Sequence, residues 1–421
     1  MSASHVLSVV YDGPDLDEIA KILRVAPEGV VALHAGCDYQ VETLGFLPGF
    51  AYLGPVDARL CLPRRLSPRP RVAAHSVGIA AGYTGVYPRA SPGGWHLLGR
   101  MVGPPLFDPR ASPPARLAVG DSVRFRAIAI GTASPADEFE SAQVAASPRY
   151  PGAPLLVVRA LGLATVQDGV RRHEQAAGVP VGGALDPDAL VAANRALGNP
   201  VDAAAIELSR GVLTLRAHGR PLSVSANGAP AARLQDGEEA TFRAGDAPLM
   251  IGVGGGVQVE VLLGSRSTCL PGAFGGYHGR ALRSGDALPV GVDPGGACFS
   301  REVKPLDEVC LSVRRAEGSL VLPDAAWELL LASAFRASLR SDRVGTRLEG
   351  PPLVRRVAGE LPPGPMVRGA IQVTHDGTPV ILGPDHPVTG GYPVIGLVTA
   401  ASRSLLGRLR AGGTVRFRAS G

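Results

Sequence analysis

Residues 116–127 read RLAVGDSVRFRA, and residues 408–419 read RLRAGGTVRFRA. The two segments are identical at eight of twelve positions without a gap. Each ends in an alternation of apolar and charged residues, which is typical of a strand with one buried face. A strand motif that recurs so far along the chain predicts duplicated β units.

A glycine pair followed by an aromatic residue accompanies the repeat. It reads GGW at 93–95, GGY at 275–277 and GGY at 390–392. The three occurrences predict three related β units, and they are too few and too far apart for a solenoid, so duplicated barrels are favoured. A single pair can also be a tight turn that enters a strand. The recurrence therefore indicates a shared structural role and does not by itself identify binding sites.

The composition supports a packed, β-rich protein. Of 421 residues, 55 are Gly and 38 are Pro, which are costly inside helices and natural in turns. The apolar fraction of 45% argues against a disordered chain. We expect a mainly β fold with few helices, at 15–24, 27–35, 186–197 and 323–335, and with strands such as 122–130 and 414–419.

A change in composition predicts the main domain boundary. Between 131 and 153 the chain turns to Ala, Ser, Pro and Glu without periodicity, as in a tether between folded units. We therefore expect a domain at 1–130, a linker at 131–153, and a domain with two barrel units at 154–421.

Charge and motif patterns exclude several classes of function. The net charge of +5 is spread without basic runs, so no nucleic-acid partner is expected. The only lysines, Lys21 and Lys304, do not follow a glycine, so a Walker-type P-loop is excluded. Five cysteines without a C-x-x-C pair fit reduced thiols in the cytoplasm. No H-x-x-x-H pair, basic-then-apolar leader or membrane-length apolar run is seen, so we expect no zincin site, name no metal ligands, and expect no signal peptide or membrane span.

Longer stretches resemble two known families. LGFLPGFAYLG at 44–54, SVGIA at 76–80 and SPGGW at 91–95 resemble the KipI-like family, also called allophanate hydrolase subunit 1 and the B subunit of bacterial 5-oxoprolinase. The later part resembles the KipA-like family, or the C subunit, in stretches that include TVQD at 165–168, GALD at 183–186, GSRST at 264–268, SDR at 341–343 and TGGYP at 389–393. The chain is thus similar to a fusion of the B and C subunits.

The resemblance implies a fold and an activity. It implies cyclophilin-like β-barrels, one in the first half and two related ones in the second. It also implies a cytoplasmic enzyme that uses ATP and a separate A subunit to open the lactam of 5-oxoproline to glutamate. Phosphorylation of the amide oxygen, with Mg²⁺, would make the lactam open to water. The resemblance leaves open whether the chain also forms a homo-oligomer.

Two alternatives remain, because related modules serve other purposes. One is another ATP-linked amide or urea-type amidohydrolase component, as in urea amidolyase or allophanate hydrolase. The other is a noncatalytic regulator of a histidine kinase. The family's usual N-terminal subdomain is not seen before residue 8, which weakens the regulator alternative. Two further departures are His75 in place of a glycine and the sequence DHPVT at 385–389, which lacks the family's glutamine.

The candidate site residues lie in these family stretches. Arginine forks can hold a carboxylate or a phosphate, and acids or amides can orient water. The catalytic candidates are Gln167, Asp168, Asp186, Glu207 and Asp342. The candidates for substrate or nucleotide binding are Arg64, Arg69, Arg71, His75, Ser76, Thr84, Tyr87, Ser91, Gly93, Gly94, Trp95, Arg100, Asn194, Arg266, Ser267, Gly275, Gly276, Arg343, Arg347, Thr389, Gly390, Gly391 and Tyr392.

Several of these residues also have a purely structural interpretation. Asp186 precedes Pro187 and a helical pattern, so it is also a helix N-cap candidate, and Asn199 is a candidate helix stop. Ser76 is not expected to be a nucleophile, because no helix pattern follows it as a nucleophile elbow requires. The run GVGGG at 252–256 is interpreted as a turn at a strand edge, since it lacks dinucleotide-loop spacing. The arginines could equally lie on exposed strand edges and keep these edges soluble.

Overall fold

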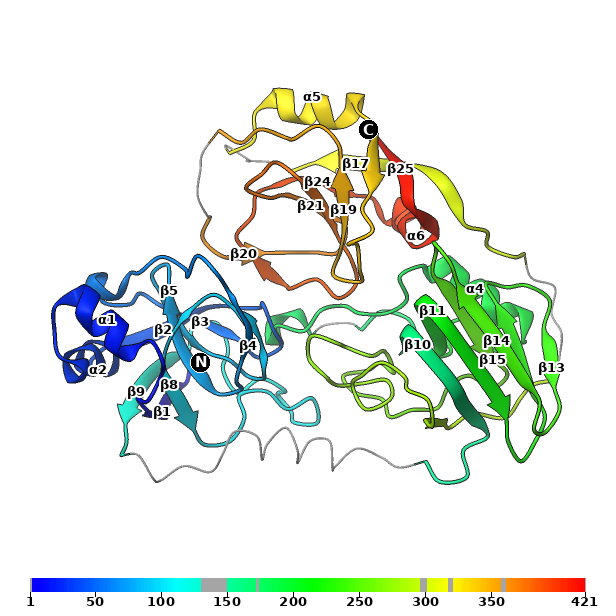
Figure 1. Cartoon of the computed structure of the whole chain (residues 1–421), viewed down its shortest axis with the longest axis horizontal. Coiled ribbons are helices and arrows are strands. Elements are labelled where there is room, and N and C mark those ends of the chain that lie inside the picture. The colour runs from blue at the N-terminus through cyan, green and yellow to red at the C-terminus, as the bar shows by residue number, and fades with distance from the viewer. Residues whose placement is uncertain are drawn as a thin grey trace. The chain divides into compact units, whose positions relative to one another are not determined.

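A computed structural model describes residues 2–129, 150–171, 174–295, 301–316, 321–356 and 361–420 (Figure 1). It is mainly β with short helices, as the sequence predicts. The chain divides into two units. The first lies within 1–147, 173–179 and 387–390, and the second takes the remainder. The linker expected at 131–153 lies outside the described residues up to 149.

The first unit is a closed barrel of seven strands. Around the barrel they run β1 (Ser4–Val10), β8 (His96–Val102), β5 (Ser76–Ala80), β6 (Tyr83–Val86), β3 (Ala51–Gly54), β2 (Asp38–Leu44) and β9 (Ser122–Ala127). β9 closes the barrel, because it pairs in parallel with β1 and antiparallel with β2. The helices α1 (Leu16–Leu23) and α2 (Pro27–Ala35) join β1 to β2, and β4 (Arg69–Val72) pairs with β7 (Ser91–Gly93). Short 3₁₀ turns cover Ala58–Leu60 and Gln175–Ala177.

A buried hydrogen-bond chain ties α2 into the interior of this barrel. The Thr84 hydroxyl donates to the carbonyl of Gly78 over 3.0 Å, so it must accept the 2.7 Å bond from His34 Nε2–H. His34 Nδ1 then accepts from the Tyr11 hydroxyl, also at 2.7 Å. His34 and Thr84 are both fully buried. Burial lowers the pKa of His34 from its ordinary value of 6.5 to about 3.

We expect this neutral histidine to make the first unit sensitive to acid. Between pH 6.5 and pH 3 the unfolded chain binds a proton at His34 that the folded chain does not bind. The free energy of unfolding therefore falls by about 1.4 kcal/mol per pH unit as the pH decreases through this window. Urea unfolding at pH 7 and pH 5.5 checks this against His34→Gln, in which all other titrating groups are kept. An equal acid loss in both proteins would contradict the assignment.

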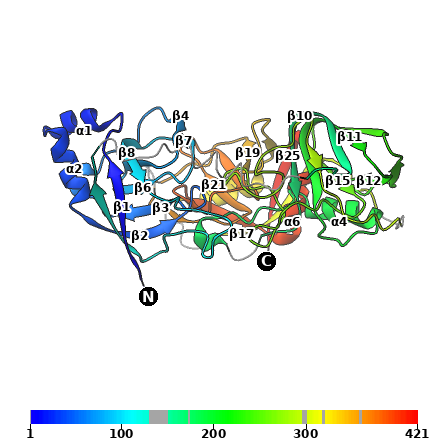
Figure 2. The same ribbon diagram turned by 90° about the horizontal axis from the view of Figure 1, so that it is seen from below.

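The second unit begins with a sheet of seven strands. The sheet runs β13 (Ala232–Leu234), β12 (Leu222–Ala226), β15 (Leu249–Val253), β11 (Ala205–Ala217), β10 (Leu155–Gln167) and β16 (Ala287–Leu288), and β14 (Glu239–Ala244) also pairs with β11. The helix α4 (Pro187–Ala196) packs on β15 and β12 (Figure 2). Among the described residues, β13 and β16 end the sheet without closing it, which differs from the closed barrel that the resemblance implies.

The open shape follows from two long strands that bend together. β10 and β11 pair over most of their length, and Gly162 faces Gly211 at the bend. Both have positive φ, +107° and +97°, and a Cβ on Gly211 would lie 1.9 Å from the Leu161 carbonyl oxygen. Beyond the bend β11 pairs with β14, and before it β11 pairs with β15. β11 thus pairs with β15 in its first part and with β14 in its last part, so the sheet divides along β11.

The second unit ends in another closed barrel. Its strands run β17 (Leu306–Arg315), β24 (Val394–Val398), β21 (Ala370–Val373), β22 (Pro379–Leu382), β19 (Gly345–Glu349), β18 (Phe335–Ala337) and β25 (Leu409–Ala419). The helices are α5 (Asp324–Ala332) and α6 (Ala400–Arg408), and two short strands are β20 (Gly364–Pro365) and β23 (Thr389–Gly390). We call this the C-terminal barrel.

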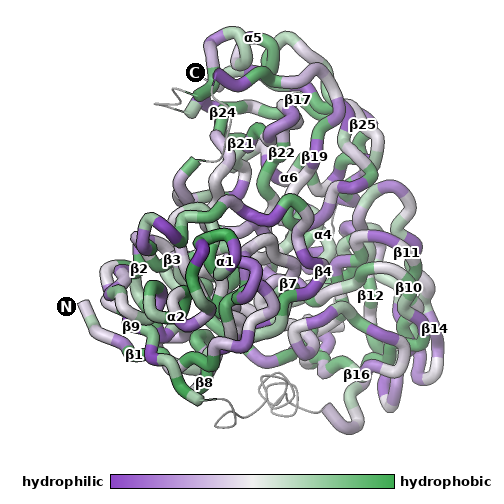
Figure 3. Tube along the Cα trace, turned by 60° about the vertical axis from the view of Figure 1, so that its left-hand side comes forward, coloured by the Kyte–Doolittle hydropathy of each residue, from purple (hydrophilic) through white to green (hydrophobic). Residues whose placement is uncertain are grey.

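The two closed barrels have the same topology, which confirms the duplication predicted from the repeat. β25 pairs in parallel with β17 as β9 pairs with β1, and Thr414 and Ser122, which are matched positions of the repeat, both lie in these paired stretches. Along β25, Val415 and Phe417 are buried while Arg416 and Arg418 face outward. Figure 3 shows the hydrophobic and hydrophilic residues along the chain trace.

Candidate functional site

Residues 180–186, with the sequence PVGGALD, form a loop before α4 in the second unit, and we call it the 180–186 segment. Gly182 and Gly183 have φ of +59° and +81°, and a Cβ on Gly183 would lie 2.6 Å from the Gly169 carbonyl oxygen. Ala184 N–H donates to the Asp168 carbonyl oxygen over 3.1 Å, which anchors the segment beside the end of β10. Glycine is needed at 183 because the backbone there has no room for a side chain.

A buried ion cluster holds this segment from the other side. Arg343 forms a two-bond pair with Asp385, at 2.8 and 3.0 Å, and a third bond to Glu207 at 2.6 Å. Its fourth bond goes to the Gly183 carbonyl oxygen at 2.9 Å. Glu207 in turn accepts from Leu185 N–H at 2.7 Å. The exposed fraction of each of the three charged side chains is at most 3%.

A second arginine balances the charge of the cluster. Arg368 is also buried and donates to the carbonyl oxygens of Ala184 and Leu185, at 3.0 and 2.9 Å. Burial, with repulsion from Arg343, lowers the pKa of Arg368 to about 10. Burial alone would lower the pKa of Arg343 as well, but Asp385 and Glu207 outweigh it and raise that pKa. Two carboxylates and two guanidiniums thus fix the backbone of the 180–186 segment.

The catalytic candidates at the end of β10 hold neighbouring loops. Asp168 accepts from the hydroxyls of Ser265 and Ser267, at 2.7 and 2.5 Å, and from Arg266 N–H at 2.6 Å. Gln167 is fully buried, and its amide nitrogen donates to Thr165 and to the Thr268 carbonyl oxygen. Its carbonyl oxygen has no hydrogen-bond partner among the described residues. The structure thus places Asp168 in contact with two of the predicted binding residues, Arg266 and Ser267.

The glycine pair at 275–276 shapes the same region. Gly275 and Gly276 have φ of +70° and +53°. A Cβ on Gly276 would lie 1.9 Å from Thr268 Oγ1, and one on Gly275 would lie 2.2 Å from the Ser267 carbonyl oxygen. The pair therefore lets one loop lie directly on another, as the sequence pattern suggests. Gly93 of the first unit packs on Tyr87 in the same way, because a Cβ on Gly93 would lie 2.4 Å from the Tyr87 hydroxyl.

Sequence reasoning missed two buried arginines of this region. Arg171 donates to the carbonyl oxygens of Pro180 and Ser267, and its guanidinium lies 4.9 Å from the centre of the Phe274 ring. Arg368 was missed as well. A buried arginine leaves no mark in composition or spacing, because the pattern around it resembles that of any exposed loop arginine. Only the residue's neighbours in space reveal its role.

Asp186 caps α4, so the structural alternative for this residue is confirmed. Its Oδ1 accepts from Asp188 N–H and Ala189 N–H, at 2.9 and 3.2 Å. Its Oδ2 accepts from Arg408 at the end of α6 over 2.9 Å. Burial raises the pKa of Asp186, and the hydrogen bond from Arg408 opposes this rise. Asp186 therefore caps α4 and, through Arg408, also forms a joint between α4 and α6.

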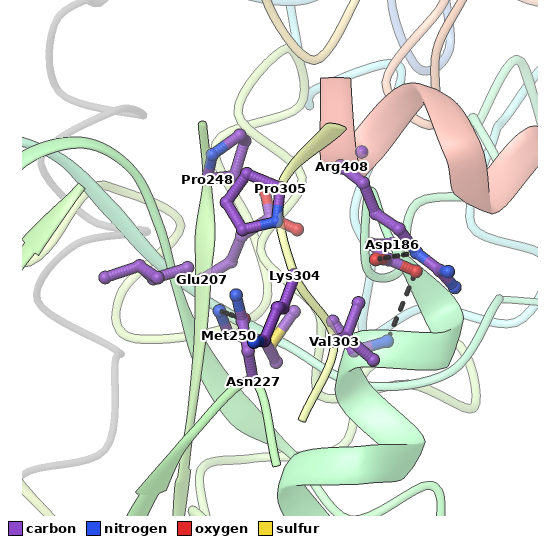
Figure 4. A pocket seen from close by; sticks show the side chains of 12 residues that line it. Asp186, Glu207, Asn227, Pro248, Met250, Val303, Lys304, Pro305 and Arg408 are labelled. Carbon is purple, nitrogen blue, oxygen red and sulfur yellow. Dashed lines mark hydrogen bonds and ion pairs between the residues drawn. The ribbon is translucent and has the colours of Figure 1, made fainter. Parts of the chain in front are cut away.

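A small recess opens beside this joint. Figure 4 shows Arg408 reaching Asp186 on one side and Lys304 beside Asn227 and Met250 on the other. Glu207 also lines the recess. Its volume is about 10 Å³, which is enough for one water molecule. The recess has room for about one water molecule, and it is too small for an organic substrate.

A larger cleft lies on the C-terminal barrel. It has a volume of about 580 Å³ and is lined by the predicted binding residues Arg347 and Tyr392. Arg340, His375 and Asp376 line it as well. This size is within the usual range of small-molecule sites. Asp342, predicted as catalytic, instead accepts from the N–H groups of Val344 and Gly345 and holds the nearby turn.

The predicted residues of the first unit lie mostly in its interior. Thr84, Tyr87 and Trp95 are buried, and burial raises the pKa of Tyr87 to about 12. Ser76 begins strand β5, so it lacks the turn into a helix that a nucleophile elbow requires. His75 is also buried, with φ of +63°. Gly94 and Ser91 are half-buried, and Arg64 and Arg71 are exposed.

Two arginines of the first unit already pair with carboxylates. Arg69 and Arg65 both bind Asp15, at 2.6 and 3.0 Å, and Asp15 also accepts from Leu97 N–H. Arg100 pairs with Asp12 at 2.9 Å. These guanidiniums join the α1 region to the barrel wall. The binding role predicted for Arg69 and Arg100 would require them to exchange these partners for a ligand.

Most of the remaining predicted residues make hydrogen bonds inside the fold. Thr389 belongs to the first unit, where its hydroxyl donates to the Leu44 carbonyl oxygen over 2.5 Å. Asn194 donates to the carbonyl oxygens of Val201 and Ala203 and accepts from Asn199, which follows the end of α4. Arg266 donates to Gln258 and to the Val259 carbonyl oxygen. Gly390 and Gly391 are half-buried.

Two absences within the described ranges bear on ligands and membranes. In these ranges, no three side chains of His, Cys, Asp or Glu are grouped so that they could hold a metal ion. No helix in the same ranges has the length and apolar character needed to cross a membrane.

Family models match both parts of the chain. A model described as carboxyltransferase domain, subdomain C and D, matches residues 2–117. A model described as carboxyltransferase domain, subdomain A and B, matches residues 177–251 and 247–419.

Curated relatives and a solved structure agree with this. The B subunit of 5-oxoprolinase from Bacillus subtilis is 50% identical over 113 residues, 27% of this chain and 47% of that protein. The C subunit of 5-oxoprolinase from Escherichia coli is 31% identical over 283 residues, 62% of this chain and 90% of that protein. Urea amidolyase of Lachancea kluyveri is 28% identical over 282 residues, 57% of this chain and 15% of that protein. The crystal structure of TTHA0988 matches with a TM-score of 0.84 and 32% identity, covering 99% of this chain and 86% of that one.

The coverage differs between the relatives. The chain spans about half the length of the B-subunit relatives, 47% and 56% for two of them, and nearly all of the C-subunit relative. The chain therefore belongs to the carboxyltransferase domain family, and it joins a region related to the B subunit of 5-oxoprolinase to a region related to the C subunit of the same enzyme.

Proposed function

We propose that this chain is a component of an ATP-dependent 5-oxoprolinase, which opens the lactam of 5-oxoproline to glutamate together with a separate A subunit. One observation carries the proposal. A single chain contains a region similar to the B subunit of that enzyme and a region similar to 90% of its C subunit. The thiols of Cys37, Cys61, Cys269 and Cys310 form no disulfide among the described residues, which fits the cytoplasmic location that we propose.

The chemistry of a lactam defines what the enzyme must supply. Resonance stabilises the amide, so water attacks it only after the amide oxygen is activated, and ATP supplies that activation in the proposed reaction. The sequence has no P-loop, so this motif assigns no residue of the chain to ATP or Mg²⁺.

The residues of this chain can position groups and orient water. Arg343 and Arg368 fix the carbonyl oxygens of Gly183, Ala184 and Leu185, so the 180–186 segment is rigid. The hydrogen-bonding groups of the segment are engaged within the protein, so its role is to hold neighbouring groups in place. Beside it, the recess lined by Asp186 and Glu207 can hold one water molecule. This combination supports a role in which the chain positions the reactants of a hydrolysis.

The proposal is tested by measuring glutamate. The purified chain is mixed with ATP, 5-oxoproline and the A subunit from a bacterium whose own B and C subunits give activity with it. We expect glutamate to form with this chain in place of the native B and C subunits. The native set is the control that shows a competent A subunit. Glutamate from the native set, with none from this chain, would contradict the proposal.

The similarity to urea amidolyase supports a second candidate, a urea-type amidohydrolase component. That match covers 15% of the amidolyase, whereas the match to the C subunit of 5-oxoprolinase covers 90% of its length. Urea in place of 5-oxoproline, in the same assay, separates the two. ATP hydrolysis that depends on urea and not on 5-oxoproline would favour the second candidate.

A further inference from the structure

The cleft on the C-terminal barrel has the size and chemistry of a small-molecule site. Its volume is about 580 Å³, which is far larger than the recess near Asp186. It lies where the β18–β19 turn meets the loop around residues 374–378, and Tyr392 completes its wall. All of these residues belong to the second unit, so the cleft is contained in one body.

Two arginines at or beside the β18–β19 turn line this cleft. Arg340 follows β18, and Arg347 lies in β19. The turn is held by Ser338 N–H, which donates to the Arg347 carbonyl oxygen over 2.8 Å, and by Ser341, whose hydroxyl accepts from Arg347 N–H over 3.1 Å. The backbone that carries the two side chains is therefore fixed.

Neither guanidinium has a hydrogen-bonding or ionic partner within the described part of the chain. Both side chains are exposed, and neither forms a hydrogen bond or an ion pair with a described residue. Other arginines of the same barrel are paired, such as Arg315 with Asp324 and Arg416 with Glu308. Two unpaired forks in one cleft present a set of donors that matches a carboxylate.

The neighbouring loop adds a further donor. His375 Nδ1 lies 3.1 Å from Arg355, and a guanidinium only donates, so Nδ1 accepts and the proton of the ring is on Nε2. The ring meets Tyr392 edge-on, with 5.2 Å between the ring centres. Asp376 is already occupied by the hydroxyls of Thr374 and Thr378. The loop thus contributes one ring N–H donor, from His375, whereas its carboxylate, Asp376, is engaged.

The charges of the lining limit the ligand. Arg340 and Arg347 are balanced by Asp376 and Glu349, so the lining as a whole has no net charge. A polyphosphate would meet two carboxylates without enough positive charge to compensate them, whereas a single carboxylate can be held by the two forks alone. The lining therefore favours a monoanion.

We propose that Arg340 and Arg347 bind the carboxylate of a small amide-containing acid in the cleft on the C-terminal barrel. The choice of 5-oxoproline as this acid rests on the proposed function. The remaining part of such a ligand is a neutral lactam, and the polar wall formed by His375 Nε2–H and Tyr392 can accommodate its oxygen.

Titration calorimetry on the full chain, without any A subunit, tests this. We expect 5-oxoproline to bind, and 2-pyrrolidinone, the same lactam without the carboxylate, to bind at least about tenfold more weakly. Arg347→Gln and Arg340→Gln should each weaken 5-oxoproline binding about tenfold or more. The control Arg416→Gln removes an exposed arginine of the same barrel that pairs with Glu308, and it should leave binding unchanged.

Three results would overturn the inference. They are no binding of 5-oxoproline by the folded wild-type chain, equal binding of 2-pyrrolidinone, and full binding by Arg347→Gln and Arg340→Gln. ATP that displaces 5-oxoproline competitively from the wild type, and loses this effect in Arg347→Gln, would also overturn the preference for a monoanion. Glutamate formation is scored separately, so binding that depends on Arg347 without glutamate contradicts only the proposed function. Glutamate that persists without such binding contradicts only the inference.

Discussion

Replacing Arg343 with alanine is expected to lower the free energy of unfolding of the second unit by about 3–5 kcal/mol. The substitution leaves Glu207 and Asp385 buried without their shared counterion. Truncating one member of a buried charge cluster costs far more than the cluster itself contributes, because the remaining charges cannot be solvated. The Gly183 carbonyl oxygen would lose its partner as well.

Urea unfolding measures the loss, and hydrogen exchange locates it. Leu185 N–H donates to Glu207, so its exchange should accelerate in Arg343→Ala together with that of the 180–186 segment. The matched control is Arg347→Ala, four positions along the same chain segment and exposed, which should change stability by less than about 0.5 kcal/mol. A loss of similar size in both variants would show that the ion cluster has no special role.

Gly276→Ala has the second largest expected effect. The new Cβ would lie 1.9 Å from Thr268 Oγ1, whose hydroxyl donates to the Val166 carbonyl oxygen at the end of β10. A methyl group at this place must push one loop off the other, and the positive φ of +53° adds strain for any side chain. We expect a loss of about 3 kcal/mol or more in the free energy of unfolding.

Gly264→Ala separates the two causes. Gly264 also has positive φ, +72°, but a Cβ there meets nothing within 4 Å. Its substitution should therefore cost about 1–2 kcal/mol, from backbone strain alone. Urea midpoints of the two variants measure the difference. If Gly264→Ala is as damaging as Gly276→Ala, close contact between the two loops is not why glycine occurs before Tyr277.

The repeat shows how far sequence reasoning reaches for the fold. The alternation in 408–419 predicts a strand with one buried face, and the matched copy at 116–127 predicts its topological equivalent. Both hold, since β25 and β9 close their barrels in the same way. The helix at 400–408 was not predicted, because its sequence includes Ser402, Ser404 and Gly407, which are weaker helix formers than Ala or Leu.

The open sheet shows where local patterns fail. Nothing in the spacing of β10 and β11 indicates that they bend at Gly162 and Gly211, because a glycine in a strand is compatible with a bulge, a bend or a ligand contact. The bend decides that β11 serves two partners. That decision depends on strands which are distant in sequence, so it becomes visible only in the folded chain.

The ion cluster shows the same limit for the site. Glu207 and Arg343 were both predicted as site residues, but their pairing joins positions 136 residues apart. The sequence identifies the kinds of groups that the fold gathers, and it does not tell an acid that acts on a ligand from one that neutralises an arginine. Arg347 and Tyr392 were predicted as binding residues and share a cleft, whereas Asp168 and Asp186 hold loops and a helix.

The assay that follows ADP and glutamate in the same mixture tests the central claim most directly. The chain is combined with ATP and a competent A subunit. It receives 5-oxoproline in one reaction and urea in another. The account predicts that glutamate and ADP rise together in equal amounts with 5-oxoproline, and that urea adds no ADP above background. ADP that rises with urea, while 5-oxoproline yields no glutamate, would contradict it.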